Sequence, residues 1–438
     1  MTIAEAVSHA TDTHACVIGA GVLGRVPEIL KEQFPDVKRV LIVADPRTWA
    51  AAGEKVSTLL SVAGVETMRH VLEPGGAEFH PEYKYVAEIK SVWHGEVPVA
   101  VGSGVINDLV KCAAGELGVP YMVVATAASV DGYTSFGAAI VSPNGVKETY
   151  ECPAPRAVVA DVDVMLTAPK LMAAFGYADL LAKSPAGAEW ILAAEIGATE
   201  WNEVGWRIVQ EPFPEAVADA SGVANGDKKA FVRLAEGLML SGFAMQHVGN
   251  SRPASGAEHR FSHILDMSHH LRDGKSCSHG EQVGVFTLYM TRFIEELLKV
   301  DVPNLDVEAC VAAWPEWETG GKQLALDTFA RTGFPDLGVR ESIRKWQTKD
   351  ELRATLRRAQ ERWPSIVSRI RVQMIPSDEI ERRLKAVGSP SAPEEIGVAK
   401  DFAAKNVRYA MLMRFRYNVL DFAFRIGKLD ELAKAATR

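Results

Sequence analysis

Hydrophobic residues in the first 165 positions gather into short runs that end in Gly or Asp. The runs span residues 14–21, 37–46, 97–104, 119–129 and 156–165. Between several of them lie amphipathic stretches with helical spacing, such as residues 105–118. Apolar runs without polar alternation are typical of strands buried on both faces, and their alternation with helices predicts a parallel α/β sheet.

After residue 165 the strand signal disappears. Long segments with helical periodicity follow at 188–209, 227–249 and 281–300, and Arg-rich segments continue the helical pattern toward the C-terminus. We therefore predict two domains, a Rossmann-like nucleotide-binding α/β domain at 1–165 and an all-α domain at 166–438.

Composition narrows the class of protein. The 438 residues are 47% hydrophobic and 24% charged, which is ordinary for a soluble globular protein. The net charge of −8 argues against a nucleic-acid binder, which usually carries a basic face. No apolar run approaches the ~18 residues of a membrane span, so we expect no membrane partner. The cysteines are scattered and the first residues lack the features of a signal peptide, so we expect a cytoplasmic protein.

Two glycine-rich turns each follow a predicted strand and open a predicted helix. The first has a GxGxxG pattern at Gly19, Gly21 and Gly24, and Asp45 ends the next strand, as in a dinucleotide-binding fingerprint. The second turn is Gly102-Ser103-Gly104, whose backbone N–H groups can approach a pyrophosphate at a helix N-terminus. Either pattern alone is equally well explained as a simple turn.

A loop of small and hydroxyl-bearing residues follows the strand near residue 123. Thr126, Ser129 and Ser135 can donate hydrogen bonds at close range because alanines beside them leave room. Asp131 is a lone carboxylate in the same loop. It is either a functional group or a turn former together with Gly132.

Several histidines cluster in one stretch of the helical region. His259 and His263 are four residues apart and share one face of a helix, and His279 follows further along the chain. A helical pair plus a distant His, completed by a carboxylate, is a common divalent metal site with an open coordination position. Surface or capping histidines are the alternative. His269 and His270 lie in a polar run and are expected to face solvent.

Taken in order, several segments resemble the sn-glycerol-1-phosphate dehydrogenases. These enzymes share a superfamily with iron-dependent alcohol dehydrogenases, glycerol dehydrogenase and dehydroquinate synthase. The resemblance covers residues from about 14 to 430 and is carried by GSGVINDLVK, VATAASVDGYTS, GYADLLAK, SRPASGAEHRFSHILD, SHGEQVGV and RFRYNVLDFAFRIG. It implies a dehydroquinate synthase-like fold. It also implies a metal-dependent NAD(P) oxidoreductase that interconverts dihydroxyacetone phosphate and sn-glycerol 1-phosphate by hydride transfer.

The resemblance implies that NAD(P) binds at the second glycine turn. The pyrophosphate would lie on Gly102, Ser103 and Gly104, and the first turn would be structural. Asp45 stands where the family's acidic residue meets the adenine ribose. A carboxylate there repels a 2′-phosphate, so we expect NAD to be preferred over NADP. The residues expected to line the nicotinamide side are Thr126, Ser129 and Ser135.

The resemblance also implies that the helical domain binds one divalent metal ion and the substrate. Asp179, in the family's G-x-x-D-x-x-x-K pattern, would ligate the ion together with His259 and His279. Zn, Ni and Fe all suit mixed His and carboxylate ligation. His263 would then hydrogen-bond the substrate, and Asp131 would hold a neighbouring hydroxyl group. The expected catalytic residues are Asp131, Asp179 and His263.

This chain departs from the family pattern near the nicotinamide and substrate side. Ser103 interrupts the usual GGG turn, and Val130 stands where His is common. Phe136 and Phe286 stand where Pro and Gly are common. These departures leave the substrate open between a phosphorylated triol or ketone and an unphosphorylated polyol such as glycerol.

Two further classes of function remain as alternatives. A dehydroquinate synthase-like lyase would recycle NAD, but it uses a more elaborate set of basic residues. A metal- or nucleotide-binding regulatory protein is the non-enzyme alternative, and the complete Asp179, His259 and His279 set speaks against it. Arg252 and Lys183 are candidates for binding a substrate phosphate, or else they form salt bridges. A homodimer is expected.

Overall fold

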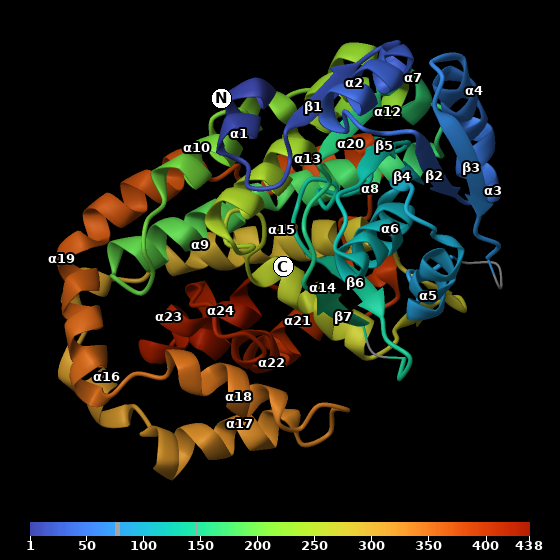
Figure 1. The fold of residues 1–438 in the computed structure, drawn as a ribbon. Coiled ribbons are helices and arrows are strands. Elements are labelled where there is room, and N and C mark those ends of the chain that lie inside the picture. The colour runs from blue at the N-terminus through green and yellow to red at the C-terminus, as the bar shows by residue number, and fades with distance from the viewer. Residues whose placement is uncertain (75–78, 146) are drawn as a thin grey trace. The chain divides into compact units, whose positions relative to one another are not determined.

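The computed structural model describes residues 1–74, 79–145 and 147–438, and it divides into two compact units. Each unit is built from segments that are distant in the sequence, as the colours in Figure 1 show. The boundary at residue 165 stays a prediction. The first unit comprises Met1–Leu180, Glu203–Ala254 and Ala386–Ser389, and the second comprises Leu181–Asn202, Ser255–Lys385 and Pro390–Arg438.

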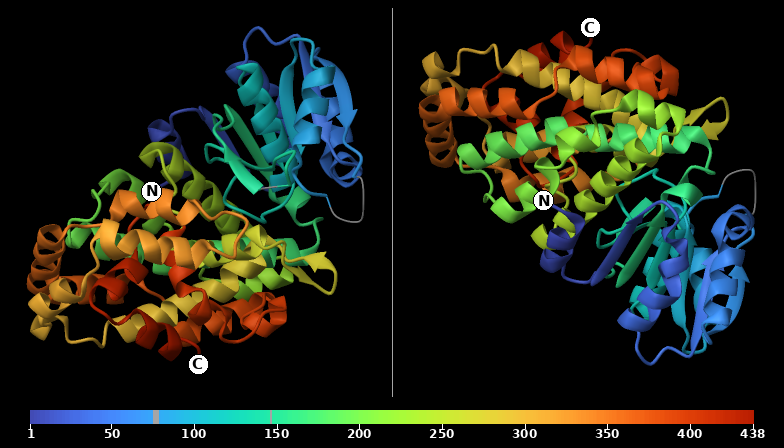
Figure 2. Two further views of the ribbon diagram at one scale, coloured as in Figure 1. Left: turned by 90° about the horizontal axis from the view of Figure 1, so that it is seen from below. Right: turned by 90° about the horizontal axis from the view of Figure 1, so that it is seen from above.

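A six-stranded parallel sheet forms the centre of the first unit, which confirms the Rossmann-like fold. Its strand order is β1-β8-β5-β4-β2-β3, and helices lie on both of its faces (Figure 2). A small antiparallel hairpin of β6 and β7 accompanies it. The strands are β1 (Ala15–Gly19), β2 (Arg39–Ala44), β3 (Glu66–Val71), β4 (Val97–Gly102), β5 (Met122–Ala125), β6 (Ala138–Val141), β7 (Lys147–Tyr150) and β8 (Ala157–Asp161).

Burial on both faces explains the unbroken apolar runs. Val40 and Ile42 of β2 join a core with α2 (Val26–Gln33) and α4 (Glu54–Val62). Their neighbour Leu41, which points to the opposite face of the sheet, is equally buried. Both faces of a central strand must therefore be apolar, as the sequence pattern indicates.

The strand order reverses between β2 and β4. The chain continues from β2 to β3 on one side, whereas β4, β5 and β8 lie on the other. Open parallel sheets bind ligands outside the carboxyl ends of their strands at such a reversal. Asp45 follows β2 and the Gly102–Gly104 turn follows β4, so the predicted cofactor residues flank this point.

Helices complete the first unit. Many of their hydrophobic residues, such as Val110 in α6 (Gly104–Leu117) and Phe243 in α13 (Lys228–Val248), are buried. The remaining helices that lie wholly or mostly in this unit are α1 (Ile3–His9), η1 (Val22–Arg25), α3 (Pro46–Thr48), η2 (Trp49–Gly53), α5 (Tyr83–Val92), α6 (Gly104–Leu117), α7 (Val162–Met165), α8 (Lys170–Leu181), α10 (Glu203–Gln210), α11 (Phe213–Ala216), α12 (Ala220–Asn225) and α13 (Lys228–Val248).

The second unit is helical apart from a short hairpin of β9 (Leu271–Arg272) and β10 (Lys275–Ser276). Helix α14 (Ala257–Met267) packs along α15 (His279–Leu297), and α9 (Lys183–Glu195) packs along α19 (Lys349–Gln373) (Figure 1). In the described part of the chain, no helix has the length and apolar character needed to cross a membrane. The other helices are η3 (Val302–Asn304), α16 (Val307–Ala313), η4 (Trp317–Gly321), α17 (Lys322–Phe329), α18 (Leu337–Ser342), η5 (Ile343–Lys345), α20 (Ser377–Val387), η6 (Pro393–Ile396), α21 (Phe402–Lys405), α22 (Val407–Leu412), α23 (Val419–Arg425) and α24 (Leu429–Ala435).

Candidate functional site

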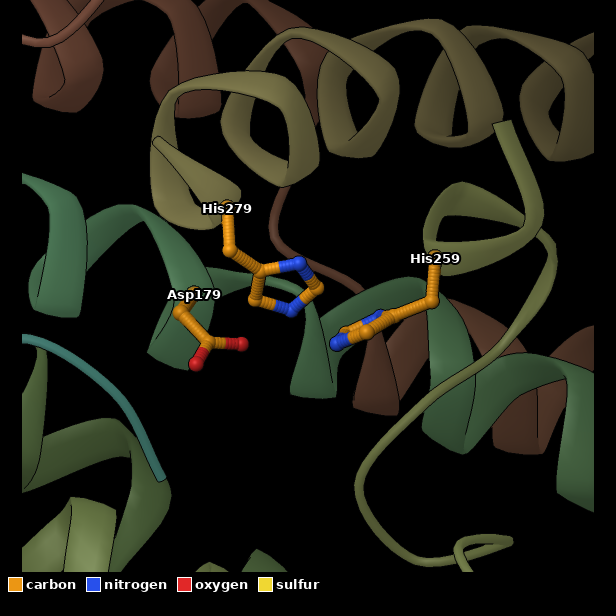
Figure 3. Close-up of side chains that lie close together, drawn as sticks. All are labelled: Asp179, His259 and His279. Carbon is orange, nitrogen blue, oxygen red and sulfur yellow. The ribbon is translucent and has the colours of Figure 1, made fainter. Parts of the chain in front are cut away.

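Three side chains that the sequence singles out lie close together. One ligand atom each of Asp179, His259 and His279 lies within 4.8 Å of the other two. Figure 3 shows the carboxylate and the two rings pointing toward one shared space. Asp179 and His259 are buried, and His279 is partly buried. One carboxylate oxygen and two imidazole nitrogens form a donor set that suits Zn, Fe or Ni, so these residues fit a divalent metal ion.

A close contact between a helix and a loop brings Asp179 to this point. Asp179 lies near the end of α8, and a Cβ on Gly176 would lie only 2.0 Å from the Ala128 carbonyl oxygen. Glycine at this position therefore lets α8 approach the loop that contains Ala128. Nearby, the backbone N–H of Asp131 donates a hydrogen bond to the Asp179 carboxylate at 3.2 Å.

His259 lies in the first turn of α14 and is held by the residue before it. Nδ1 of His259 lies 2.9 Å from Oε1 of Glu258, whose side chain is completely buried. Burial raises the pKa of Glu258, but the hydrogen bond and the charge of a protonated His259, together with backbone hydrogen bonds, outweigh this and hold the pKa below its usual value. An ionised carboxylate here would accept a hydrogen bond from Nδ1–H and leave the ring's lone pair on Nε2.

A capping box positions His279. The hydroxyl of Ser278 accepts a hydrogen bond from the Glu281 N–H, and the Glu281 carboxylate accepts one from the Ser278 N–H. This reciprocal pair fixes the start of α15 so that His279 is its first residue. Nδ1 of His279 lies 3.2 Å from the hydroxyl of Ser262 in α14.

His263 lies beside this group. Its ring centre is 6.4 Å from that of His279, whereas the ring centres of His259 and His279 are 5.2 Å apart. His263 is partly buried, on the same helix as His259. A contact with substrate stays a prediction for this residue.

His269 and His270, the two histidines of the polar run, differ from each other in exposure. His269 is exposed, as expected. The expectation that His270 faces solvent is wrong, because it is half-buried and its Nε2 pairs with the Ile396 carbonyl at 2.8 Å. Arg272 also binds this segment, through the Glu395 carbonyl. The turn η6 thus covers the hairpin that follows α14.

The second glycine turn requires minimal side chains. A Cβ on Gly102 would lie 2.4 Å from Ile106, and one on Gly104 would lie 3.0 Å from Val130. Ser103 is the N-cap of α6, but its side chain makes no capping hydrogen bond to the described residues. The N–H groups at the start of α6 therefore lack a side-chain cap. Uncapped N–H groups at a helix N-terminus are the arrangement that binds phosphate groups.

A buried lysine shapes the loop after β5. Lys111 in α6 is fully buried, and its ammonium donates hydrogen bonds to the carbonyl oxygens of Gly132, Ser135 and Gly137 at 2.8, 2.8 and 3.1 Å. Burial lowers the pKa of Lys111, and the nearby Asp108 opposes this shift. Three carbonyl acceptors match the three ammonium donors, so Lys111 holds the loop in one conformation.

The hydroxyl-bearing residues of this loop are buried, as are the alanines between them. Thr126 is tied to the second glycine turn, because its N–H donates a hydrogen bond to the Gly102 carbonyl at 3.1 Å. The Ser135 hydroxyl donates to the Gly132 carbonyl at 3.0 Å. Contacts of Thr126, Ser129 and Ser135 with a nicotinamide ring stay predictions.

Asp131 links the loop to a second helix. Its carboxylate accepts a hydrogen bond from the Ser241 hydroxyl in α13 at 2.8 Å, and the side chain is partly buried. Its own N–H binds Asp179. Asp131 is therefore more than a turn former with Gly132, since both its backbone and its side chain are fixed next to a candidate metal ligand.

The first glycine turn holds a carboxylate of the chain itself. The N–H groups of Gly21 and Leu23 donate hydrogen bonds to the two carboxylate oxygens of Asp161, at 3.0 and 2.7 Å. Asp161 ends β8, the neighbour of β1 in the sheet. The donors that a pyrophosphate would need at this turn are therefore occupied by protein.

Asp45 lies at the other side of the strand reversal. Its Oδ1 accepts hydrogen bonds from the backbone N–H groups of Arg47 and Thr48, at 2.8 and 3.0 Å, and so caps α3. The side chain is partly exposed. A contact with an adenine ribose, which stays a prediction, would use the other oxygen.

Lys183 and Arg252, the two candidates for phosphate binding, are more buried than the side chains of a surface salt bridge. Lys183 is completely buried at the start of α9, and Arg252 is 8% exposed. The N–H of Arg252 donates to the Asn250 side chain at 2.9 Å. Phosphate binding by either side chain stays a prediction.

Sequence reasoning did not single out Glu258, Ser262 or Asp161, which shape the site. Glu258 had a signal, because an acidic residue stands directly before a candidate ligand histidine. The Ser-x-x-Glu pattern at 278–281 also signals the start of a helix. Asp161 had none, since its contacts join residues far apart in the sequence. Gly176 is the glycine of the G-x-x-D-x-x-x-K pattern, but its close approach to Ala128 has no signal in the sequence.

Known proteins resemble this chain along most of its length. The model of the family described as iron-containing alcohol dehydrogenase matches residues 17–169. The NAD(P)+-dependent glycerol-1-phosphate dehydrogenase of Halalkalibacterium halodurans is 33% identical over 287 residues, which are 64% of this chain and 70% of that protein. A protein of the same name from Bacillus velezensis is 31% identical over 69% of this chain and 79% of its own length.

Solved structures resemble the chain in fold. Glycerol dehydrogenase from Schizosaccharomyces pombe gives a TM-score of 0.61 at 17% identity, covering 98% of this chain and 91% of that one. Maleylacetate reductase from Agrobacterium tumefaciens gives a TM-score of 0.60 at 15% identity, covering 98% of each chain. At these identities the likeness shows a common fold of the iron-dependent alcohol dehydrogenase type.

Proposed function

This chain belongs to the glycerol-1-phosphate dehydrogenase family of iron-containing alcohol dehydrogenases, and we propose that it interconverts dihydroxyacetone phosphate and sn-glycerol 1-phosphate. In this reaction C2 of dihydroxyacetone phosphate would accept a hydride that bound NAD(P)H supplies, and the carbonyl oxygen would accept a proton. The reverse reaction returns both. The proposal is carried by one observation: the meeting of Asp179, His259 and His279 within 4.8 Å, in a chain with relatives of this name.

The cofactor would lie along the carboxyl edge of the parallel sheet. The uncapped N–H groups at the start of α6 would bind its pyrophosphate, with Gly102 and Gly104 allowing close approach of the backbone. Asp45, across the strand reversal, would accept a hydrogen bond from the 2′-OH of the adenine ribose. Its negative charge would repel a 2′-phosphate and so favour NAD over NADP.

The substrate would lie against Asp131, His263 and the metal ligands. A divalent ion such as Zn, Ni or Fe would supply Lewis-acid polarisation of the reacting oxygen. Asp131 would accept a hydrogen bond from a neighbouring hydroxyl group of the substrate, and Ser241 holds its carboxylate for this. The backbone N–H of Asp131 also binds Asp179. The residue that would accept the substrate hydroxyl and one metal ligand are therefore held in a fixed relative position.

Steady-state kinetics with a matched pair of ketones tests this function. After loading with Zn, Ni or Fe, the protein should oxidise NADH with dihydroxyacetone phosphate. We expect kcat/KM to exceed that for dihydroxyacetone by about 100-fold or more, since two charge-assisted hydrogen bonds to phosphate at ~1.5 kcal/mol each give this factor. Equal rates with both ketones would favour a polyol dehydrogenase. Inactivity on both would overturn the proposal.

The substrate role of His263 is tested separately. We expect His263→Ala to keep its bound metal and its KM for NADH, and to lose about 10- to 150-fold in kcat/KM for dihydroxyacetone phosphate. This loss corresponds to about 1.5–3 kcal/mol for one hydrogen bond to a charged group. Loss of metal from His263→Ala would instead make this residue a ligand. Homodimer formation and a cytoplasmic location stay predictions.

A further inference from the structure

The two candidate metal histidines have unlike partners at Nδ1, the ring nitrogen that is not needed for the metal. His259 faces the carboxylate of Glu258, and His279 faces the hydroxyl of Ser262. The tautomer of each ring decides whether Nε2 carries a lone pair or a proton. These partners therefore bear directly on whether both rings can ligate a metal ion.

The Glu258 carboxylate is fixed as an acceptor. Its Oε1 accepts a hydrogen bond from the Gly256 N–H and also faces Nδ1 of His259. Glu189, another buried carboxylate, accepts from the Ala257 N–H at 3.1 Å and so holds the same helix start. If Oε1 also accepts from the ring, the proton of the neutral His259 ring lies on Nδ1.

The hydrogen-bonded pair of Ser262 and Gln282 sets the other ring. The amide nitrogen of Gln282 donates to the Cys277 carbonyl at 3.2 Å and to Asp266 at 3.4 Å, which turns its amide oxygen toward Ser262. The Ser262 hydroxyl donates its one proton to that oxygen at 2.7 Å. Ser262 can then only accept from Nδ1–H of His279.

We propose that Glu258 and the Ser262–Gln282 pair are positioning residues that hold both imidazoles in the tautomer with Nε2 toward the metal, and that they make the two ligands unequal. The inference rests on the proposed metal centre. A carboxylate polarises a ring N–H more strongly than a hydroxyl does, because a charge-assisted hydrogen bond is about twice as strong as a neutral one. His259 is therefore the stronger donor and His279 the weaker.

Zinc affinity of the full-length protein tests the inference, measured by competition with a chelator. Partners of metal-ligating histidines contribute about 10- to 100-fold to metal affinity. We expect Glu258→Gln, which keeps the shape but removes the charge, to weaken zinc binding toward the upper end of that range. Ser262→Ala should weaken it toward the lower end. Thr287→Val removes a buried hydroxyl from α15 without touching either ring and should leave the affinity unchanged.

The histidine tautomers give a second readout that a purely structural role would not move. Nitrogen-15 NMR of the metal-free chain, with signals assigned by their loss in His259→Ala and His279→Ala, should show both rings protonated at Nδ1. Ser262→Ala should give His279 a mixture of tautomers and leave His259 unchanged.

Three outcomes decide the inference. The predicted order of zinc affinities, together with the tautomer change confined to His279, supports it. If the wild type binds zinc and the affinities of Glu258→Gln and Ser262→Ala both stay within about twofold of it, the inference is overturned and the proposed function stands. No zinc binding by the wild type would overturn the metal centre together with the inference.

Discussion

The two glycine turns of the sheet unit have similar sequences and different surroundings. Both follow a parallel strand and precede a helical segment. At the first turn the backbone donors of Gly21 and Leu23 bind the carboxylate of Asp161, and a four-residue 3₁₀ turn leads directly into the eight residues of α2. At the second, the 14 residues of α6 begin at Gly104 with no side-chain cap from the described residues.

The difference shows what a glycine pattern needs before it can bind phosphate. Glycine only lets the backbone approach a ligand, whereas the attraction comes from N–H groups that no protein acceptor occupies and from the dipole of a helix of some length. The first turn has the spacing of a dinucleotide fingerprint but lacks the first condition, because Asp161 occupies its donors, and its helical segment begins with a 3₁₀ turn. The second departs from the family's GGG pattern through Ser103 and meets both.

The largest effect on this comparison is expected from Gly104→Val. A Cβ at this position already lies 3.0 Å from Val130, so the larger side chain must push the turn away from a bound pyrophosphate. We expect the KM for NADH to rise about 10- to 150-fold, the loss of one hydrogen bond to a charged group at ~1.5–3 kcal/mol.

Gly21→Ala is the matched control at the first turn. Gly21 has a φ of +71°, so an alanine there should lower the free energy of unfolding by about 1–2 kcal/mol. The KM for NADH should stay within about twofold. A larger rise in KM for Gly21→Ala than for Gly104→Val would reverse the roles assigned to the two turns.

Asp161→Ala tests whether the backbone donors of the first turn serve stability rather than cofactor binding. It leaves the N–H groups of Gly21 and Leu23 without their acceptor, so we expect chemical denaturation to show a loss of about 1–3 kcal/mol in unfolding free energy. NADH binding should not change. The control is Asp163→Ala, two residues further along the chain. It removes an exposed carboxylate that pairs with Lys228, and it should have little effect on stability. Weaker NADH binding in Asp161→Ala would place the cofactor at the first turn.

The smallest effect is expected at Asp45. Asp45→Asn keeps an acceptor for the N–H groups of Arg47 and Thr48 while removing the charge. We expect the ratio of kcat/KM with NADH to that with NADPH to fall by roughly threefold to tenfold, about 0.5–1.5 kcal/mol, with unchanged stability. An unchanged ratio would remove Asp45 from the cofactor site.

Much of the fold was predictable because strands that are buried on both faces must consist of apolar residues. Strands such as β2, apolar on both faces, read as unbroken hydrophobic runs. The β6–β7 hairpin was missed, although Asn144-Gly145 is a typical hairpin turn and Gly145 has a φ of +77°. The grouping of residues 203–254 with the sheet was not predictable, since helical periodicity shows that a helix has a buried face and not what covers it.

The candidate site divides in the same way. His259 and His279 were candidates because of their residue type and spacing, whereas Asp179 followed from the resemblance to the family's G-x-x-D-x-x-x-K pattern. Glu258 and Ser262 were not candidates, because a carboxylate and a hydroxyl have too many structural uses for their presence alone to indicate a role. Their part follows only from the direction of each hydrogen bond.

The central claim is that Asp179, His259 and His279 together hold one metal ion that the reaction needs. Elemental analysis of purified variants, measured beside their activity, tests it most directly. We predict that Asp179→Asn, His259→Ala and His279→Ala each lose both bound metal and activity, because two remaining ligands cannot hold the ion against water, and that exposed His269→Ala keeps both. Full metal occupancy in His259→Ala would contradict the account.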